Sequence, residues 1–248
     1  MRLKLARWFF AFTVLVVITS ITVSVWLAVT VTPTIYTYGA VHEPSEFTSV
    51  AARVATVFCY FTNVTGCIIG VVSLLLAINP MRSSPAFAVW RLISVVSAII
   101  VEAIFNLLLA PNYTAPSALA EWANNLGDRA VPALCIIGWL VFGPRLAMST
   151  RTVMLSLIYG LVFVAFTLVR GGLFEVPGQQ NDHWYPYPFL DATVYGYPFV
   201  FAVVGGLLVV CIGLGYAVLA LDKVLPGPKP PKRAQLPPAI PAAPYSHP

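Results

Sequence analysis

Charged residues are scarce in this chain. Asp, Glu, Lys and Arg make up only 9% of its 248 residues, whereas an ordinary soluble domain carries about 25%. Hydrophobic residues account for 59%, and the mean hydropathy is +0.85. Because so few charges could not cover the surface of a water-soluble protein, the composition excludes a soluble globular domain and predicts an integral membrane protein.

Cysteine is also scarce. The four cysteines lie apart within apolar runs, and none has the Cys-x-x-Cys or Cys/His spacing of a zinc site. We therefore expect neither a metal nor another cofactor. The net charge of +5 comes without a basic patch of interleaved aromatic residues, so we expect no nucleic-acid partner. Nothing in the sequence assigns an oligomeric state.

The sequence does contain six apolar runs, most of them long enough to cross a bilayer. The candidate spans are residues 8–32, 51–78, 88–110, 125–142, 152–171 and 199–221. We therefore expect an all-α membrane protein, a bundle of six transmembrane helices that occupies residues 1–223. Nine of the last 25 residues are proline, which predicts a disordered, Pro-rich cytoplasmic tail over residues 224–248.

The basic residues are distributed unevenly between the two sides of this bundle. In a six-span topology the two ends of the chain and the loops after the second and fourth spans lie on one side. That side, with the helix ends beside it, carries eleven of the fourteen basic residues. Only Arg53, Arg129 and Arg170 lie on the other side. Since cytoplasmic loops are enriched in Lys and Arg, we expect both termini to be cytoplasmic. We further expect the protein to lie in the cell membrane, with membrane lipids as partners.

Polar residues inside a span are the ones most informative about function. Thr62 and Asn63 lie near the outer end of the second span, and Arg170 ends the fifth span on that side. Glu102 and Asn106, near the outer end of the third span, are four residues apart and so share one helix face. Several spans thus place polar groups in the outer half of the bundle, which predicts an outward-facing polar pocket.

The segment Asp182–Asp191 carries the densest polar and aromatic pattern of the chain. Two prolines within it oppose regular helix. We interpret it as a stiff interfacial cap that roofs a lipid-accessible pocket, with aromatic side chains anchored where membrane meets water. The residues of this segment that we predict to support the pocket are His183, Trp184, Tyr185, Tyr187 and Asp191.

Structural roles remain open for several of these residues. The Thr62 hydroxyl could bond to the carbonyl four residues before it, as threonine often does in membrane helices. Glu102 could pair with Arg170, or it could hydrogen-bond to Asn106. His183 could be an ordinary loop residue, since no second histidine lies near it in the sequence.

Four segments occur in an order that suggests a family. They are Tyr60-Phe61-Thr62-Asn63, Val131-Pro132, Gly138-Trp139-Leu140 with Gly143-Pro144-Arg145, and Trp184-Tyr-Pro-Tyr-Pro-Phe-Leu-Asp191. Together they resemble actinobacterial six-span membrane proteins related to the androgen-induced-gene family, and the resemblance covers the second to sixth spans. Eukaryotic members of that family are intramembrane threonine hydrolases that cleave fatty acid esters of hydroxy fatty acids. They use a threonine in the second span and a histidine shortly before the proline of the fourth.

On this chain the resemblance implies Thr62 as the nucleophile, but Asp128 occupies the position of the histidine. A hydroxyl needs an adjacent base to become a good nucleophile. A carboxylate of ordinary pKa, about 3.9, is a weak base near neutrality, and the neighbouring Arg129 would lower that pKa further. His183 is an alternative base.

Two functions are therefore open. The first is a non-catalytic membrane protein that keeps the pocket for lipid binding. The second is a lipid-ester hydrolase that cleaves a fatty-acyl ester, with Thr62 and Asp128 as catalytic residues and Asn63 or Asn106 as donor to the oxyanion. The loss of the histidine favours the first.

Overall fold

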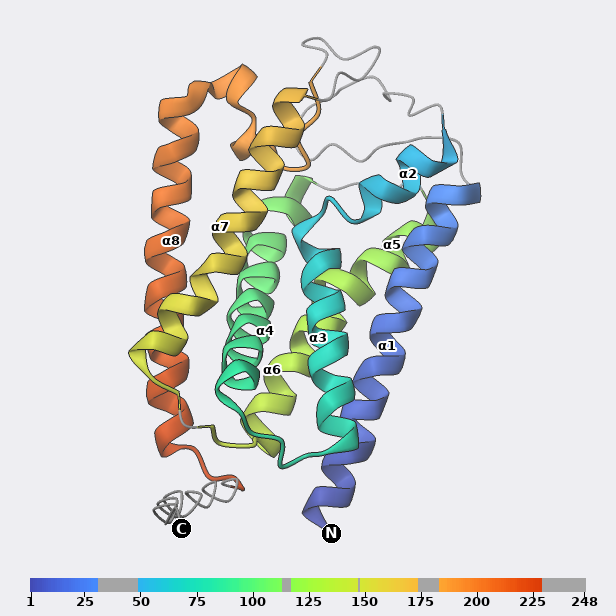
Figure 1. Cartoon of the computed structure of the whole chain (residues 1–248). Helices are drawn as coiled ribbons and strands as arrows, with labels where there is room; N and C mark the ends of the chain where they lie inside the picture. Colours follow the sequence, from blue (N-terminus) through green and yellow to red (C-terminus); the bar gives the residue numbers. More distant parts are fainter. Residues whose placement is uncertain (31–48, 113–116, 147, 174–182, 229–248) are drawn as a thin grey trace, which may run out of the picture.

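The computed structural model describes residues 1–30, 49–112, 117–146, 148–173 and 183–228. Within these ranges the regular elements are helices (Figure 1), and six helical segments are long and apolar enough to cross a membrane. The segments are α1 (Arg2–Thr30), α3 (Phe61–Ile78), α4 (Pro85–Ile104) with the π-helical turn η1 (Phe105–Leu109), the continuous run of α5 (Ala118–Asn125), η3 (Leu126–Ala130) and α6 (Val131–Phe142), α7 (Thr150–Leu173), and α8 (Ala192–Val224). The expected all-α bundle of six spans is confirmed, and the chain is a multi-pass integral membrane protein.

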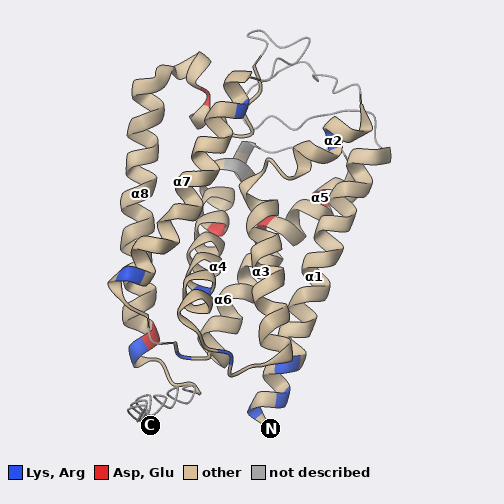
Figure 2. Cartoon of the chain, viewed as in Figure 1, with Lys and Arg blue, Asp and Glu red and all other residues tan. Residues whose placement is uncertain are grey.

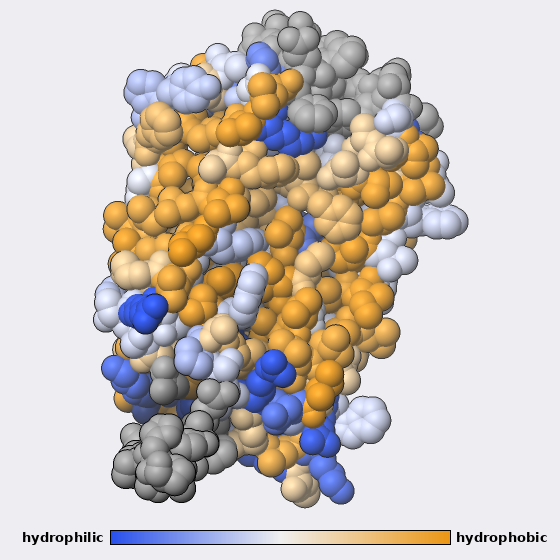
Figure 3. Space-filling view, in the orientation of Figure 1, coloured by the Kyte–Doolittle hydropathy of each residue, from blue (hydrophilic) through white to orange (hydrophobic). Residues whose placement is uncertain are grey.

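The outside of the bundle is apolar between its two ends. Large hydrophobic side chains such as Trp26, Val162 and Val209 are exposed, and hydrophobic residues cover most of the middle of the face seen in Figure 3. Lys and Arg gather at the end where α1 begins and α8 ends (Figure 2). We call this the terminal end, and the opposite end the loop end. The assignment of the terminal end to the cytoplasm remains a prediction.

Helix α4 lies at the centre of the bundle. It packs against α3, α6, α7 and α8, and its residues Leu92, Val95 and Ala98 are fully buried. Helix α1 packs on the side formed by α3 and α6, and α8 packs beside α7. Polar groups that approach α4 are therefore enclosed by protein on most sides.

The second span is not the continuous helix over residues 51–78 that the sequence predicted. Helix α2 (Val50–Val57) ends before α3 begins, and residues 58–60 form the turn between them. The N–H groups of residues 58 and 59 bond to carbonyls three residues back, a tightening that is common at helix ends. The Asn63 side-chain amide bridges the break by donating to the Val57 carbonyl (2.8 Å).

Two spans contain a π-helical turn just before a proline. Turn η1 ends two residues before Pro111, and η3 ends two residues before Pro132. Proline has no N–H and its ring clashes with the carbonyl four residues back, so the regular α-helix is disturbed at these positions. The fourth span also begins at Ala118 rather than near residue 125, because the Ser117 side chain accepts the Ala120 N–H and starts the helix earlier.

The sixth span begins at Ala192, well before the expected residue 199. The Asp191 carboxylate accepts N–H groups of the first turn and caps α8. The helix is then kinked at Gly196, whose φ of 76° is readily adopted only by glycine, and Pro198 follows. The expected boundary therefore corresponds to the kink. The first and fifth helices also begin a few residues early, because they continue past the apolar run into its polar flank. The third begins at Pro85, where the Ser84 side chain accepts the Phe87 N–H and caps the helix.

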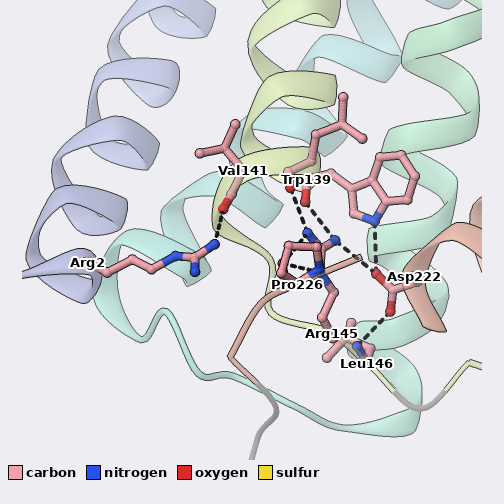
Figure 4. Close-up of polar contacts among 8 residues, drawn as sticks. Arg2, Trp139, Val141, Arg145, Leu146, Asp222 and Pro226 are labelled. Atoms are coloured by element: carbon pink, nitrogen blue, oxygen red, sulfur yellow. Dashed lines mark hydrogen bonds and ion pairs between the residues drawn. The ribbon is translucent and has the colours of Figure 1, made fainter. Parts of the chain in front are cut away.

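A buried ion pair between Arg145 and Asp222 closes the terminal end (Figure 4). Both side chains are 2% exposed, and Nη1 lies 3.3 Å from Oδ1. Arg145 also donates to the carbonyls of Trp139 and Leu140 at the end of α6. Asp222 accepts from Trp139 Nε1 and from the Leu146 N–H. One buried network thus joins α6 to α8.

Arg145 also holds the start of the C-terminal segment. Its Nη2 donates to the Pro226 carbonyl (3.1 Å), and its backbone N–H donates to the Pro228 carbonyl (3.0 Å). Of the residues 224–228, expected as the start of a disordered tail, Val224 ends α8 and the others lie against Arg145 at the terminal end. The rest of the predicted tail, residues 229–248, lies outside the described residues.

We predict that Asp222→Ala lowers the free energy of unfolding by about 3 kcal/mol or more, because Arg145 and Trp139 Nε1 lose a buried acceptor. Thermal unfolding of the detergent-purified protein measures the effect. Glu121→Ala, which removes an exposed carboxylate on α5, is the control and should unfold like the wild type. Equal stability of the two variants would contradict the prediction.

Candidate functional site

Thr62 lies at a helix N-terminus that the break in the second span creates. It is the second residue of α3, whose N-cap residue, Tyr60, makes no side-chain cap bond. The start of α3 is capped instead by Tyr187, which lies 126 residues further along the chain. Its hydroxyl accepts the Phe61 N–H (2.9 Å). The same phenol also interacts with the backbone and the side chain of Thr62.

Asp128 reaches the same place from the fourth span. It lies within η3, and its side chain is only 6% exposed. Its carboxyl group is close enough to the Thr62 side chain, to Tyr187 and to Glu102 to interact with all three. Three side chains from three separate parts of the chain, Thr62, Asp128 and Tyr187, thus form one polar group.

A cavity of about 120 Å³ begins at this polar group. Residues of α3, α4, α7 and α8 bound it, together with the short helix η4 (Pro188–Leu190). Its walls are otherwise mainly apolar and include Ile100, Leu157, Leu190, Val204 and Leu208. In the third span the lining residues extend from Phe105, the first residue of η1, to Ile93 on α4, which is ~18 Å at 1.5 Å per residue. The cavity is therefore a narrow slot parallel to the helices, with its polar group at the loop end.

The segment before α8 lies over the loop end of the slot, and its aromatic rings point inward. Trp184, Tyr185 and Tyr187 are all buried. The Trp184 ring packs edge-on against Tyr60 (5.9 Å between centroids), and the Arg170 guanidinium lies 4.6 Å from its centre. These rings are therefore core side chains rather than the surface anchors that the sequence suggested. Only Tyr187 of the three lines the slot.

Two other residues of this segment have local contacts outside the slot. His183 Nδ1 lies 3.1 Å from the Gly171 carbonyl oxygen, and the Asp191 carboxylate caps α8. Neither residue lines the slot. The geometry thus brings Asp128, and not the alternative base His183, to Thr62.

Glu102 and Asn106 belong to a second polar group beside the slot. Asn106 Nδ2 donates to Glu102 Oε1 (3.1 Å), and Arg129 Nε donates to Asn106 Oδ1 (3.2 Å). Of the two partners considered for Glu102, the structure shows Asn106. Arg170 lies instead against Trp184. This group links the third span to the fourth close to Asp128 without entering the slot.

The two side-chain amides considered as oxyanion donors, Asn63 and Asn106, do not line the slot. A donor that does line the slot beside Thr62 is the phenol of Tyr187. Burial raises the pKa of Tyr187 above its ordinary value, so the hydroxyl stays protonated. Because the oxygen accepts the Phe61 N–H, the phenol is held in place and its own proton can be donated to another oxygen.

The sequence did not reveal the walls of the slot. Tyr159 contributes one of them, and its hydroxyl lies 2.9 Å from Thr65 Oγ1. Its ring packs against Phe61, with 5.4 Å between centroids. Helices α4, α7 and α8 carry apolar residues on nearly every side, so residues that face the slot have the same sequence signal as residues that face lipid.

The arrangement can bind and orient a polar group by hydrogen bonds from a hydroxyl, a carboxyl group and a phenol. A hydroxyl beside a carboxylate is also an arrangement in which a base can activate a nucleophile. Among the residues that the structure describes, no group of three or more His, Cys, Asp or Glu side chains is placed to hold a metal ion. Comparisons with protein-family models, curated proteins and solved structures found no match to this chain.

We predict that Gly171→Ala destabilises the protein by about 1–3 kcal/mol, because the added methyl group would overlap the Tyr185 ring. Gly172→Ala is the matched control, since a methyl group there meets no other atom. Thermal unfolding of both variants in detergent checks the difference. If Gly171→Ala were as stable as Gly172→Ala, the prediction would be wrong, and the close packing of the Tyr185 ring on α7 would not contribute to the stability of the protein.

Proposed function

We propose that the protein binds one acyl chain of a membrane lipid in the slot, with the polar end of the lipid at Thr62, Asp128 and Tyr187. The observation that carries this proposal is the polarity of the slot, whose lining is mainly apolar apart from the hydroxyl groups of Ser97, Ser156 and Tyr159, and whose carboxyl group, that of Asp128, lies at the loop end. That distribution is complementary to an amphiphile. Water would find few hydrogen-bond partners along such walls, whereas acyl chains surround any membrane protein.

In this proposal the protein lies in the cell membrane with its loop end toward the outer leaflet. The gathering of Lys and Arg at the terminal end supports that orientation, because cytoplasmic flanks carry such an excess. The lipid would then come from the outer leaflet, on the side where the polar group lies.

Filling the slot tests the binding proposal. Val204 lines the slot, whereas Val209 on the same helix is 69% exposed on the outer surface. We predict that Val204→Trp reduces the acyl lipid that co-purifies with the protein by about tenfold, because the larger ring would occupy the space of the chain and such overpacking costs about 1–3 kcal/mol. Val209→Trp should leave the lipid content unchanged. Solvent extraction and mass spectrometry give the amount of lipid per mole of protein.

Gel filtration identifies the correctly folded fraction of both variants before extraction. An unchanged lipid content in folded Val204→Trp would mean that the lipid binds elsewhere and that the proposal is wrong.

Ester hydrolysis is the second candidate function, and the proximity of the buried Asp128 carboxyl group to the Thr62 side chain specifically favours it. The family resemblance supports it, and the absence of the expected histidine weighs against it. In such a reaction Thr62 Oγ attacks the ester carbonyl carbon while its proton passes to Asp128, and the Tyr187 phenol donates to the oxyanion. The alcohol leaves with the proton from Asp128. Water, deprotonated by Asp128, then attacks the acyl-threonine, which releases the acid and restores the Thr62 hydroxyl.

A fluorophosphonate probe that labels activated hydroxyls tests this reaction. If it operates, the wild type is labelled and Thr62→Val is not, because the variant keeps the shape of the side chain without the oxygen. Thr65→Val, on the same helix, should keep its labelling, and Asp128→Asn should lose most of it. Labelling that survives in Thr62→Val, or a wild type that is not labelled, rules out hydrolysis. Neither result affects the separate test of lipid binding.

A further inference from the structure

The slot is closed toward the terminal end by a contact between two helices. Its lining residues nearest that end are Ile93 on α4, Ser156 on α7 and Cys211 on α8. About one turn further, α7 and α8 touch, since a methyl group on Gly215 would lie 2.8 Å from Val153 Cγ1. Val153 is completely buried. Although neither residue lines the slot, their contact packs α7 against α8 one turn beyond it, and we call this contact the floor of the slot.

The slot is also narrow. A volume of about 120 Å³, spread over the ~18 Å that its lining covers along the third span, leaves room for one extended chain. Near the polar end three rings restrict it further, because Phe61 packs against Tyr159 and Phe163 with 5.4 and 5.0 Å between centroids. The space is better suited to one extended chain than to a bulky ring system or to two chains side by side.

The position of the ligand's polar end is defined as well. The Tyr187 phenol is held by the Phe61 N–H, and Asp128 is buried beside it. A carboxylate next to the Asp128 carboxyl group would meet a like charge whenever both were ionised. The geometry therefore favours a neutral oxygen-bearing group, such as an ester or a hydroxyl, at this end.

We propose that the slot selects the length of the bound acyl chain, measured from the polar group at Thr62 to the floor at Val153 and Gly215. This inference rests on the proposed binding of an acyl lipid. With one end of the ligand held by hydrogen bonds and the other closed by packed helices, each additional carbon has to displace protein. Because extra methylenes in a packed interior force the surrounding atoms apart, a chain that exceeds the slot loses a factor of about five or more in affinity, which corresponds to about 1 kcal/mol.

Two variants move the floor in opposite directions. Cys211→Phe places a larger side chain above the floor, and Val153→Ala removes volume from the floor itself. Val210→Phe is the matched control, because Val210 is the neighbour of Cys211 and is 52% exposed on the outer surface.

The probe is an equimolar series of saturated 1-O-alkylglycerols of increasing chain length. They have one chain and a neutral head, and their ether bond cannot be hydrolysed as an ester. Delipidated, detergent-purified protein is incubated with the series, and mass spectrometry determines the chain lengths that remain bound. We expect Cys211→Phe to shift the distribution toward shorter chains, Val153→Ala to shift it toward longer ones, and Val210→Phe to match the wild type.

An unchanged distribution in folded Cys211→Phe, with an unchanged total amount bound, would overturn length selection and leave the binding proposal intact. If the wild type bound no more ligand than Val204→Trp, the binding proposal would fail, and length selection with it. Thermal unfolding verifies the fold of each variant. Should Val153→Ala not fold, Cys211→Phe alone decides the outcome.

Discussion

The hydrogen bond from the Phe61 N–H to the Tyr187 hydroxyl joins the two parts of the chain on which the slot depends. Inside a bilayer an interrupted helix leaves backbone groups without water, so such a break requires partners from the protein itself. The break at residues 58–60 is satisfied in this way by the segment before α8. The same bond holds Tyr187 over the slot and orients the start of α3, where Thr62 lies.

The two ends of the bundle differ in how their helices are held together and in how regular those helices are. At the terminal end Arg145 and Asp222 join α6 to α8 through a buried ion pair and its hydrogen bonds. At the loop end the helix irregularities accumulate: the start of α3, the π-helical turns η1 and η3, and the kink at Gly196. Non-helical backbone at membrane depth is tolerated where protein buries it or where it lines a cavity. The irregular end is accordingly the one that holds the polar group.

The sequence identified the spans and singled out Thr62 and Asp128, but it misjudged several neighbours. It predicted a continuous second span, because an apolar run does not show that a helix is interrupted within it. It treated Trp184 and Tyr185 as surface anchors, since aromatic residues near a membrane boundary carry the same pattern whether they face lipid or protein. Asn63 and Asn106 were assigned to the pocket, yet both are engaged by groups outside the slot.

The sequence by itself determined that this is a six-span, all-α membrane protein, because the hydrophobic length needed to cross a bilayer is a local property of each segment. Only the tertiary structure decided which polar residues meet and which apolar residues enclose the slot. Helices that are apolar on all sides do not encode which face turns inward. The contacts of Tyr187 with Phe61 and of Asp128 with Thr62 connect distant parts of the chain, so they exist only once the helices have packed.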